Sequence, residues 1–141
     1  MTVSANLIVA SRVPQLFDTQ RWVPVRQHKV AIQIKDKTKN PKLMLSLSPL
    51  FAIEGGCDIY PQLSAGPFAY RVADYLTPAE RAATHTIGPK ELQEMIGVNP
   101  PSVVAISSPP DFFEVSLRDS VVKPGWKNII YDMSSMVYHK P

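Results

Sequence analysis

The sequence is short of cysteine, glycine and long apolar runs: its 141 residues include one cysteine and six glycines. A single cysteine, Cys57, excludes an intramolecular disulfide, and beside two glycines it is more typical of a packed residue than of a nucleophile. The apolar run near the N-terminus covers only residues 5–10, whereas a membrane-spanning helix needs roughly 20 residues. That run lacks a basic region before it and a cleavage site after it. The sequence therefore predicts a soluble chain without a signal peptide.

The motifs of the common enzyme classes are also missing. The only Gly-Gly pair, at 55–56, lacks the Gly-x-Gly-x-x-Gly spacing of dinucleotide-binding loops, and no Walker sequence is present. The three histidines are far apart and have no carboxylate or thiol at ligand spacing. No Gly-x-Ser-x-Gly motif is found. We therefore predict no cofactor, no metal and no catalytic residue.

Proline and apolar residues are, in contrast, plentiful. Fourteen prolines indicate many stiff connections, and 45% apolar with 19% charged residues is globular usage. We expect one α/β domain over 22–141 after an N-terminal capping segment over 1–21. The net charge is +6 over residues 1–50 and −3 over 51–141. A solvated basic surface explains this better than a surface for anionic lipid or nucleic acid, because exposed aromatics are not interleaved with the basic residues.

The pattern of apolar residues and prolines predicts the elements. A short helix capped by Ser4 is possible over 4–17. A helix is predicted in which one face carries Trp22, Val25, Lys29 and Ile32. The alternation over 30–34 also fits a strand followed by a hairpin loop over 36–41, and we favour the helix. Residues 42–48 alternate as a core strand that stops at Pro49, and 50–64 is predicted to be a long loop.

The remainder of the chain alternates between helices and strands. One helix is predicted to begin near Pro67, and Thr77-Pro78-Ala79-Glu80 has the form of a capping box that starts another. A third is predicted from Gly88-Pro89 to Gly97. After a buried strand over 102–106, Asp111 is suited to cap a helix, and strands follow over 127–132 and 136–139.

This order predicts an α/β fold: a small Rossmann-like three-layer domain with a mostly parallel sheet of about four strands and helices on both faces. The last strand is expected to be an antiparallel edge. If the strands that end near Ser48 and Ser107 are parallel neighbours, both ends lie at one sheet edge, where open α/β folds bind ligands.

The candidate binding residues follow from that geometry. In one interpretation, helix N-terminal amides and Arg71 bind an anion such as phosphate at this edge. In the other, which we favour, Ser64 and Asp111 are helix caps, Glu54 bonds loop amides and Arg71 is a solvent-exposed helix residue. The full candidate set consists of Glu54, Gly55, Gly56, Tyr60, Ser64, Gly66, Arg71, Ser107 and Asp111.

Several short motifs occur in a distinctive order: Glu54-Gly55-Gly56, Tyr60-Pro61, Gly66-Pro67-Phe68 and Tyr70-Arg71. With "NPPSVVAIS" and "PGWKNIIYDMSSMVYHKP" behind them, they resemble the C-terminal soluble tail of bacterial membrane glycosyltransferases of the dolichyl-phosphate-mannose-protein mannosyltransferase type. The resemblance runs from about Trp22 to the end.

The resemblance implies an extracytoplasmic domain that follows a membrane-spanning region, with residues 1–21 as a membrane-proximal segment. The catalytic acids of that family lie between transmembrane helices, which this sequence lacks. The expected function is therefore non-catalytic: binding of a polyprenyl-phosphate sugar donor, of an acceptor, or of the membrane domain of a glycosyltransferase. The alternative is a stand-alone protein-interaction module, with homo-oligomer formation as one option, anchored through Trp22, Phe112, Phe113 and Trp126.

Overall fold

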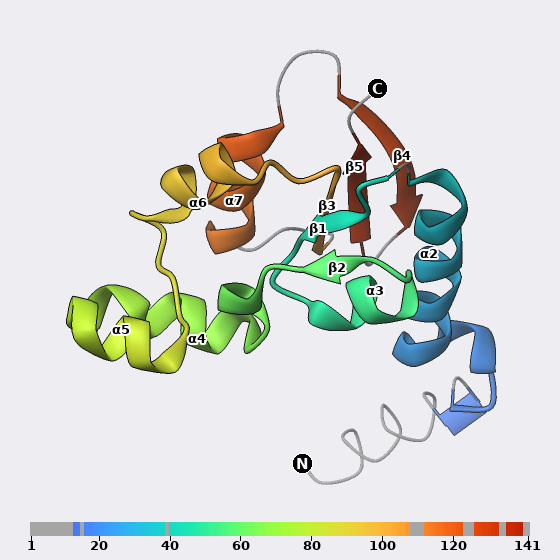
Figure 1. Cartoon of the computed structure of the whole chain (residues 1–141). Helices are drawn as coiled ribbons and strands as arrows, with labels where there is room; N and C mark the ends of the chain where they lie inside the picture. The colour runs from blue at the N-terminus through green and yellow to red at the C-terminus, as the bar shows by residue number, and fades with distance from the viewer. Residues whose placement is uncertain are drawn as a thin grey trace, which may run out of the picture.

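The computed structural model describes residues 13–14, 16–38, 40–107, 112–122, 126–132 and 135–139, and the fold is α/β. The described strands form one five-stranded mixed sheet in the order β2-β1-β3-β5-β4 (Figure 1). β1 pairs in parallel with β2 and β3, and β5 pairs antiparallel with β3 and β4. In chain order the strands are β1 (Leu43–Leu45), β2 (Asp58–Ile59), β3 (Val103–Ser107), β4 (Lys127–Asp132) and β5 (Ser135–His139).

Helical segments connect most of these strands. The α-helices are α2 (Val23–Lys37), α3 (Pro49–Glu54), α4 (Gly66–Val72), α5 (Pro78–Thr84), α6 (Leu92–Val98) and α7 (Phe112–Val121). The described residues also include three 3-10 turns: η1 (Thr19–Arg21), η2 (Pro61–Leu63) and η3 (Ala73–Tyr75). In the part of the chain that the structure describes, no helix is long and apolar enough to cross a membrane.

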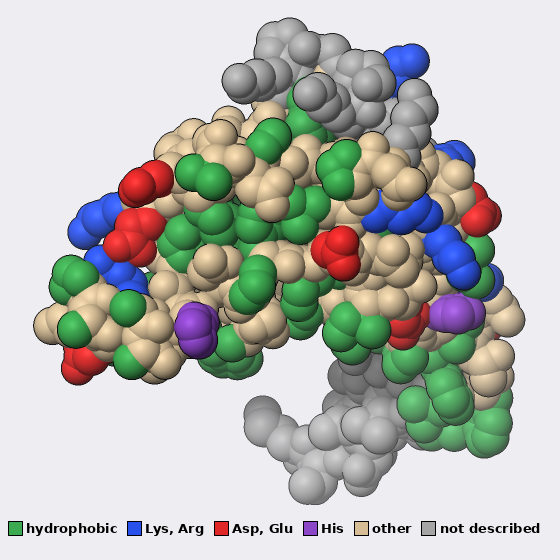
Figure 2. All heavy atoms as spheres, viewed as in Figure 1, with side chains coloured by type: hydrophobic (Ala, Val, Ile, Leu, Met, Phe, Trp, Pro, Cys, Tyr) green, Lys and Arg blue, Asp and Glu red, His purple; other side chains and the backbone are tan. Residues whose placement is uncertain are grey.

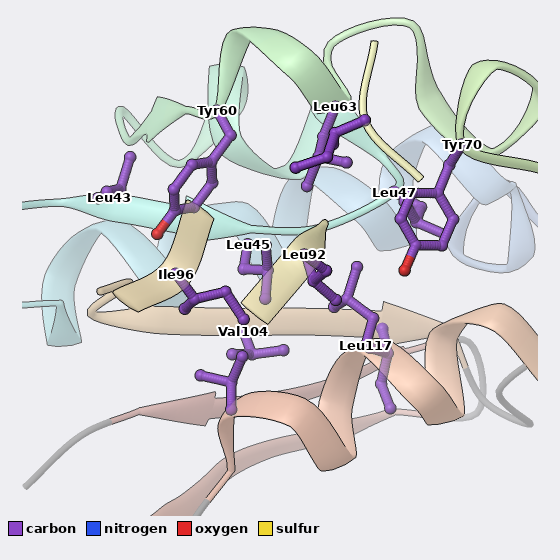
Figure 3. Packing of buried hydrophobic residues seen from close by; sticks show 13 residues of the cluster. Leu43, Leu45, Leu47, Tyr60, Leu63, Tyr70, Leu92, Ile96, Val104 and Leu117 are labelled. Atoms are coloured by element: carbon purple, nitrogen blue, oxygen red, sulfur yellow. The ribbon is translucent and has the colours of Figure 1, made fainter. Parts of the chain in front are cut away.

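Two apolar clusters lie on the two sides of the sheet. Because side chains alternate along a strand, Leu43 and Leu45 of β1 enter one cluster and Met44 enters the other. The larger cluster receives Tyr60 after β2 and Leu92 of α6, together with residues of α4 and α7 (Figure 3). The smaller one packs α2 and α3 against Met44, Val103, Ala105 and Val137.

The structure confirms the helix that the sequence favours, but not its predicted face, because Trp22, Lys29 and Ile32 of that face are exposed. Val30, Ala31 and Ile34 are the buried residues of α2, and their spacing of one, three and four places them on one helical face toward the sheet. The alternative strand with a hairpin loop over 36–41 is therefore wrong. The short helix predicted over 4–17 falls mostly outside the described residues.

The predicted long loop over 50–64 is wrong. It contains α3, β2 and η2, so that β1, α3 and β2 form a compact parallel unit. Pro49, which was interpreted as a strand terminator, is the first residue of α3, a position where its fixed φ and missing N–H are no disadvantage. Phe51 and Ala52 then bury the inner face of the helix.

The C-terminal hairpin differs from expectation in its order. The last strand, β5, is antiparallel as predicted, but it lies between β3 and β4, so β4 is the edge. At this inner place Val137 of β5 is fully buried, and it is paired with Ala105 of β3.

The strands that end near Ser48 and Ser107 are parallel neighbours, which is the condition for both ends to lie at one sheet edge. Leu45 of β1 is paired with Val104 of β3. From β1 the chain first adds β2 on one side and later β3 on the other, so the order reverses between β1 and β3. Ligands of open α/β sheets bind at such a reversal, outside the carboxyl ends of the strands.

Candidate binding site

At the carboxyl end of β3, Ser107 is bonded to Glu114 in the first turn of α7. The Ser107 backbone N–H donates to Glu114 Oε1 over 3.0 Å, and the Ser107 hydroxyl donates to Glu114 Oε2. Glu114 is buried. Since a buried carboxylate needs hydrogen bonds to balance its loss of water, this contact accounts for its position and holds α7 against the strand.

The start of α4 lies against the end of β1. Gly66 has φ +71°, and a Cβ there would lie 3.1 Å from the carbonyl oxygen of Leu47, so glycine meets both the backbone conformation and the close approach. On the same helix, the guanidinium carbon of Arg71 is 5.1 Å from the centroid of the Phe113 ring of α7. The structure thus brings Gly66, Arg71 and Ser107 to one sheet edge.

Tyr70 packs beside these residues. Its ring meets Phe113 edge to face, with centroids 6.1 Å apart. The side chain is fully buried, and its hydroxyl has no hydrogen-bond partner among the described residues. Burial, with a smaller contribution from the charge of Asp74, raises the pKa of Tyr70 to about 12.

Three other predicted residues have local roles or lie elsewhere. The hydroxyl of Tyr60, just after β2, donates to the backbone carbonyl of Asn99 over 2.5 Å, and burial raises its pKa. The hydroxyl of Ser64 donates to the Pro61 carbonyl over 2.7 Å, within its own turn, and Ala65 is the N-cap of α4, so the prediction that Ser64 caps this helix is wrong. Asp111 lies outside the described residues.

The placement of Glu54, Gly55 and Gly56 near the carboxyl edge is wrong. After β1, α3 runs back along the sheet and delivers these residues beside Asp58, which pairs with Leu43 at the amino end of β1. There Glu54 Oε2 lies 3.1 Å from Nδ1 of His28 on α2. Gly55 has no room for a side chain, because a Cβ would lie 2.7 Å from the Phe51 carbonyl oxygen.

A cleft of about 600 Å³ lies elsewhere, between η2, α5 and α6. We call it the α5–α6 cleft. Apolar side chains form most of its walls, among them Pro61, Pro78, Ile87, Met95 and Val98. Polar side chains enter it from both helices and from the turn between them: Arg81, His85, Thr86, Glu91, Glu94 and Asn99. Figure 2 shows acidic and basic side chains beside an apolar strip at this end of the molecule.

Arg81 spans the base of the α5–α6 cleft. Its Nη1 donates to the carbonyls of Ala73 (3.2 Å) and Leu76 (2.6 Å), and its Nη2 donates to Glu91 Oε1 (2.6 Å). Its Nε is buried without a partner among the described residues. The guanidinium therefore ties η3 and α5 to the start of α6 and fixes the width of the cleft.

The α5 wall depends on local interactions, because α5 has no buried residue. Thr77 and Glu80 form the predicted capping box: the Glu80 N–H donates to Thr77 Oγ1 (3.3 Å) and the Thr77 N–H to Glu80 Oε2 (2.8 Å). The bond from the Thr77 backbone N–H, followed by that from its hydroxyl, lowers the pKa of Glu80. His85 ends the helix with a left-handed φ of 49°.

The chemistry that the cleft offers is hydrogen bonding, apolar contact and charge interaction through its carboxylates. No three His, Cys, Asp or Glu side chains among the described residues gather where they could hold a metal ion. Sequence reasoning identified the capping box and named Tyr60, which lines the cleft, but missed Arg81, Glu91 and Glu94. Nothing in the spacing of Arg81 and Glu91 signals their contact, since it depends on the path of residues 85–90.

Comparison of the chain with protein-family models, with curated proteins and with solved structures found no match.

Proposed function

We propose that this chain is a binding domain without catalytic chemistry of its own, similar to the extracytoplasmic tail of a polyprenyl-phosphate-sugar-dependent glycosyltransferase. In this proposal it binds a donor, an acceptor or a partner of such an enzyme. The observation that carries the proposal is the α5–α6 cleft of about 600 Å³, because ligand pockets are typically about 300–1,000 Å³ in volume with apolar walls and a few convergent polar groups.

The contacts of Arg81 with Ala73, Leu76 and Glu91, which we call the Arg81 clamp, support a binding role for this cleft. A polar side chain that is fixed before a ligand arrives loses little conformational freedom on binding, so less of the interaction energy is spent on ordering. Arg81 is only 18% exposed and holds Glu91, which is 40% exposed and still faces the cleft. The clamp therefore presents a fixed carboxylate to a ligand.

The arrangement of the sheet also bears on this proposal. We also propose that the domain is a Rossmann-like three-layer one, supported by the reversal of strand order between β1 and β3 and by apolar clusters on both sides of the sheet. The proposed binding surface differs from the usual one of such domains, because the α5–α6 cleft lies beyond the end of β2 rather than at the reversal.

An NMR titration of the ¹⁵N-labelled chain tests the proposed function. A short-chain, water-soluble polyprenyl-phosphate sugar, a glycosyl acceptor and a detergent-solubilised glycosyltransferase membrane domain are added separately. We expect amide shifts that cluster on η2, α5 and α6 with at least one of them, and no sugar transfer by the isolated chain. Turnover by the chain alone, or the absence of shifts with all three, would overturn the proposal.

A second candidate function is a stand-alone protein-interaction module. It is favoured by large apolar side chains that are highly exposed: Phe17 (80%), Phe68 (79%), Tyr75 (89%), Val98 (84%) and Phe112 (82%). Of the predicted anchors, Trp22 and Phe112 are exposed, whereas Phe113 and Trp126 are partly buried against the larger apolar cluster. Exposed aromatic residues are frequent anchors at protein interfaces. Size-exclusion chromatography with light scattering separates the two functions, since a concentration-independent homodimer would favour the module and a monomer the tail-like binding domain.

A further inference from the structure

Most N–H donors of Arg81 are already hydrogen-bonded to groups of the protein itself. Both N–H groups of Nη1 have carbonyl acceptors, one N–H of Nη2 is bonded to Glu91, and the Nε hydrogen lies where no ligand reaches it. Binding of a phosphate or carboxylate by arginine usually uses two parallel N–H groups of the guanidinium. Arg81 has no such pair left to offer.

The charges that line the α5–α6 cleft also disfavour an anion. Arg81 is the cationic side chain of the lining besides His85, and its charge is matched by Glu91 at 2.6 Å. Glu94, also in the lining, is exposed and has no partner among the described residues. With His85 neutral, the lining carries one net negative charge, and that charge is centred on Glu94.

An apolar surface lies next to this carboxylate. Met95 follows Glu94 on α6, and Val98 lies one turn further on with 84% exposure. The buried Ile87, in the turn between the helices, also lines the cleft. A ligand with an apolar body and a positively charged end would cover these side chains while its charge meets Glu94. An anion would instead be repelled by the Glu94 carboxylate, since the charge of Glu91 is matched by Arg81.

We propose that the α5–α6 cleft binds an organic cation, that is, a primary ammonium group carried on an apolar body. The proposal rests on the proposed function and narrows it, because a cation-binding cleft suits an amine-bearing acceptor or a basic partner segment and does not suit the phosphate of a donor.

A series of probes with the same apolar body and different end groups tests this proposal. Hexylammonium, hexanol and hexanoate are titrated separately into the ¹⁵N-labelled full chain, and affinities are taken from the shifts of amides in α5 and α6. We expect hexylammonium to bind most tightly and hexanoate most weakly. Since exposed ion pairs contribute about 0.2–1 kcal/mol, the advantage of hexylammonium over hexanol should be about 1.5- to 5-fold.

Two variants give the same charge change at different places. Glu94→Gln should remove the advantage of hexylammonium over hexanol, whereas Asp36→Asn, on the exposed side of α2 outside the cleft lining, should preserve it. Both positions are exposed, so both variants are expected to fold, which the dispersion of the amide spectrum verifies.

The outcomes separate this proposal from the one on which it rests. Equal or tighter binding of hexanoate, an advantage that persists in Glu94→Gln, or no shifts with hexylammonium each overturn cation binding. If hexanol or hexanoate still shifts the amides of α5 and α6, the cleft remains a binding site and only the cation preference fails. The proposed function itself fails if the donor, acceptor and membrane-domain titrations also leave the spectrum unchanged.

Discussion

Two buried tyrosines should respond in opposite directions to the same substitution. Tyr60 and Tyr70 belong to one apolar cluster and are 4% and 1% exposed. The Tyr60 hydroxyl donates to the Asn99 carbonyl over 2.5 Å, whereas the Tyr70 hydroxyl has no partner among the described residues. Replacement by phenylalanine removes only the hydroxyl, so the rest of the packing stays comparable.

The magnitudes follow from the balance between desolvation and hydrogen bonding. Tyr60→Phe should lower the free energy of unfolding by about 0.5–1.5 kcal/mol, the net value of a typical hydrogen bond. Tyr70→Phe should raise it by about 1 kcal/mol, because an uncompensated buried polar group costs about 1–3 kcal/mol and some contacts of the hydroxyl are lost. For a chain of this size, 1 kcal/mol corresponds to about 3–5 °C in Tm.

Urea unfolding followed by circular dichroism measures both changes, with the midpoint carrying the effect if the slope m is unchanged. An alkaline titration adds a check. Because the pKa of Tyr70 is raised from 10.0 to about 12 in the folded state, its ionisation favours the unfolded chain, so this group leaves stability unchanged below pH 10 and lowers it as the pH rises from 10 toward 12. Tyr70→Phe should lose less stability over that range than the wild type. A loss of stability in both variants at neutral pH would refute the reasoning.

Two further predictions concern local contacts. Gly55→Ala should destabilise the protein by about 1–3 kcal/mol in urea unfolding, because the added methyl lies 2.7 Å from the Phe51 carbonyl oxygen and 3.3 Å from Ile34 Cγ2; Gly97→Ala, whose Cβ meets nothing within 4 Å, is the matched control and should be neutral or stabilising. Thr77→Ala should cost about 1 kcal/mol at neutral pH by removal of the α5 cap. The pKa of Glu80 is lowered in the folded state, so its carboxylate stabilises the cap above the unfolded pKa near 4.5, and this stabilisation is lost as the pH falls through the lower folded value. The difference in unfolding free energy between wild type and Thr77→Ala should therefore shrink in acid. A difference that grows in acid would contradict this account.

The parts of the fold that local sequence determines were predictable. The capping box at Thr77 was identified because threonine, proline and glutamate have the right spacing, and the strand over 102–106 because five apolar and small residues stand between proline pairs. The parallel pairing of β1 with β3 also agrees with expectation.

Contacts between distant segments were not predictable in the same way. Pro49 is compatible with two predictions, since proline both ends strands and begins helices. Only the burial of Phe51 and Ala52 shows that a helix begins there. The direction of α3 then carries Glu54 away from the predicted edge. Arg81 and Glu91 meet only because of the turn between α5 and α6, so no local pattern marks the cleft.

The central claim, that the α5–α6 cleft is the binding surface, is tested most directly by blocking it. Ala82 lines the cleft from α5, whereas Ala83 is exposed on the same helix outside the lining. Ala82→Trp should therefore reduce hexylammonium binding at least about tenfold, the equivalent of 1.4 kcal/mol, while Ala83→Trp should leave it at the wild-type value. Equal affinity of the two variants would contradict the assignment of the cleft as the binding site.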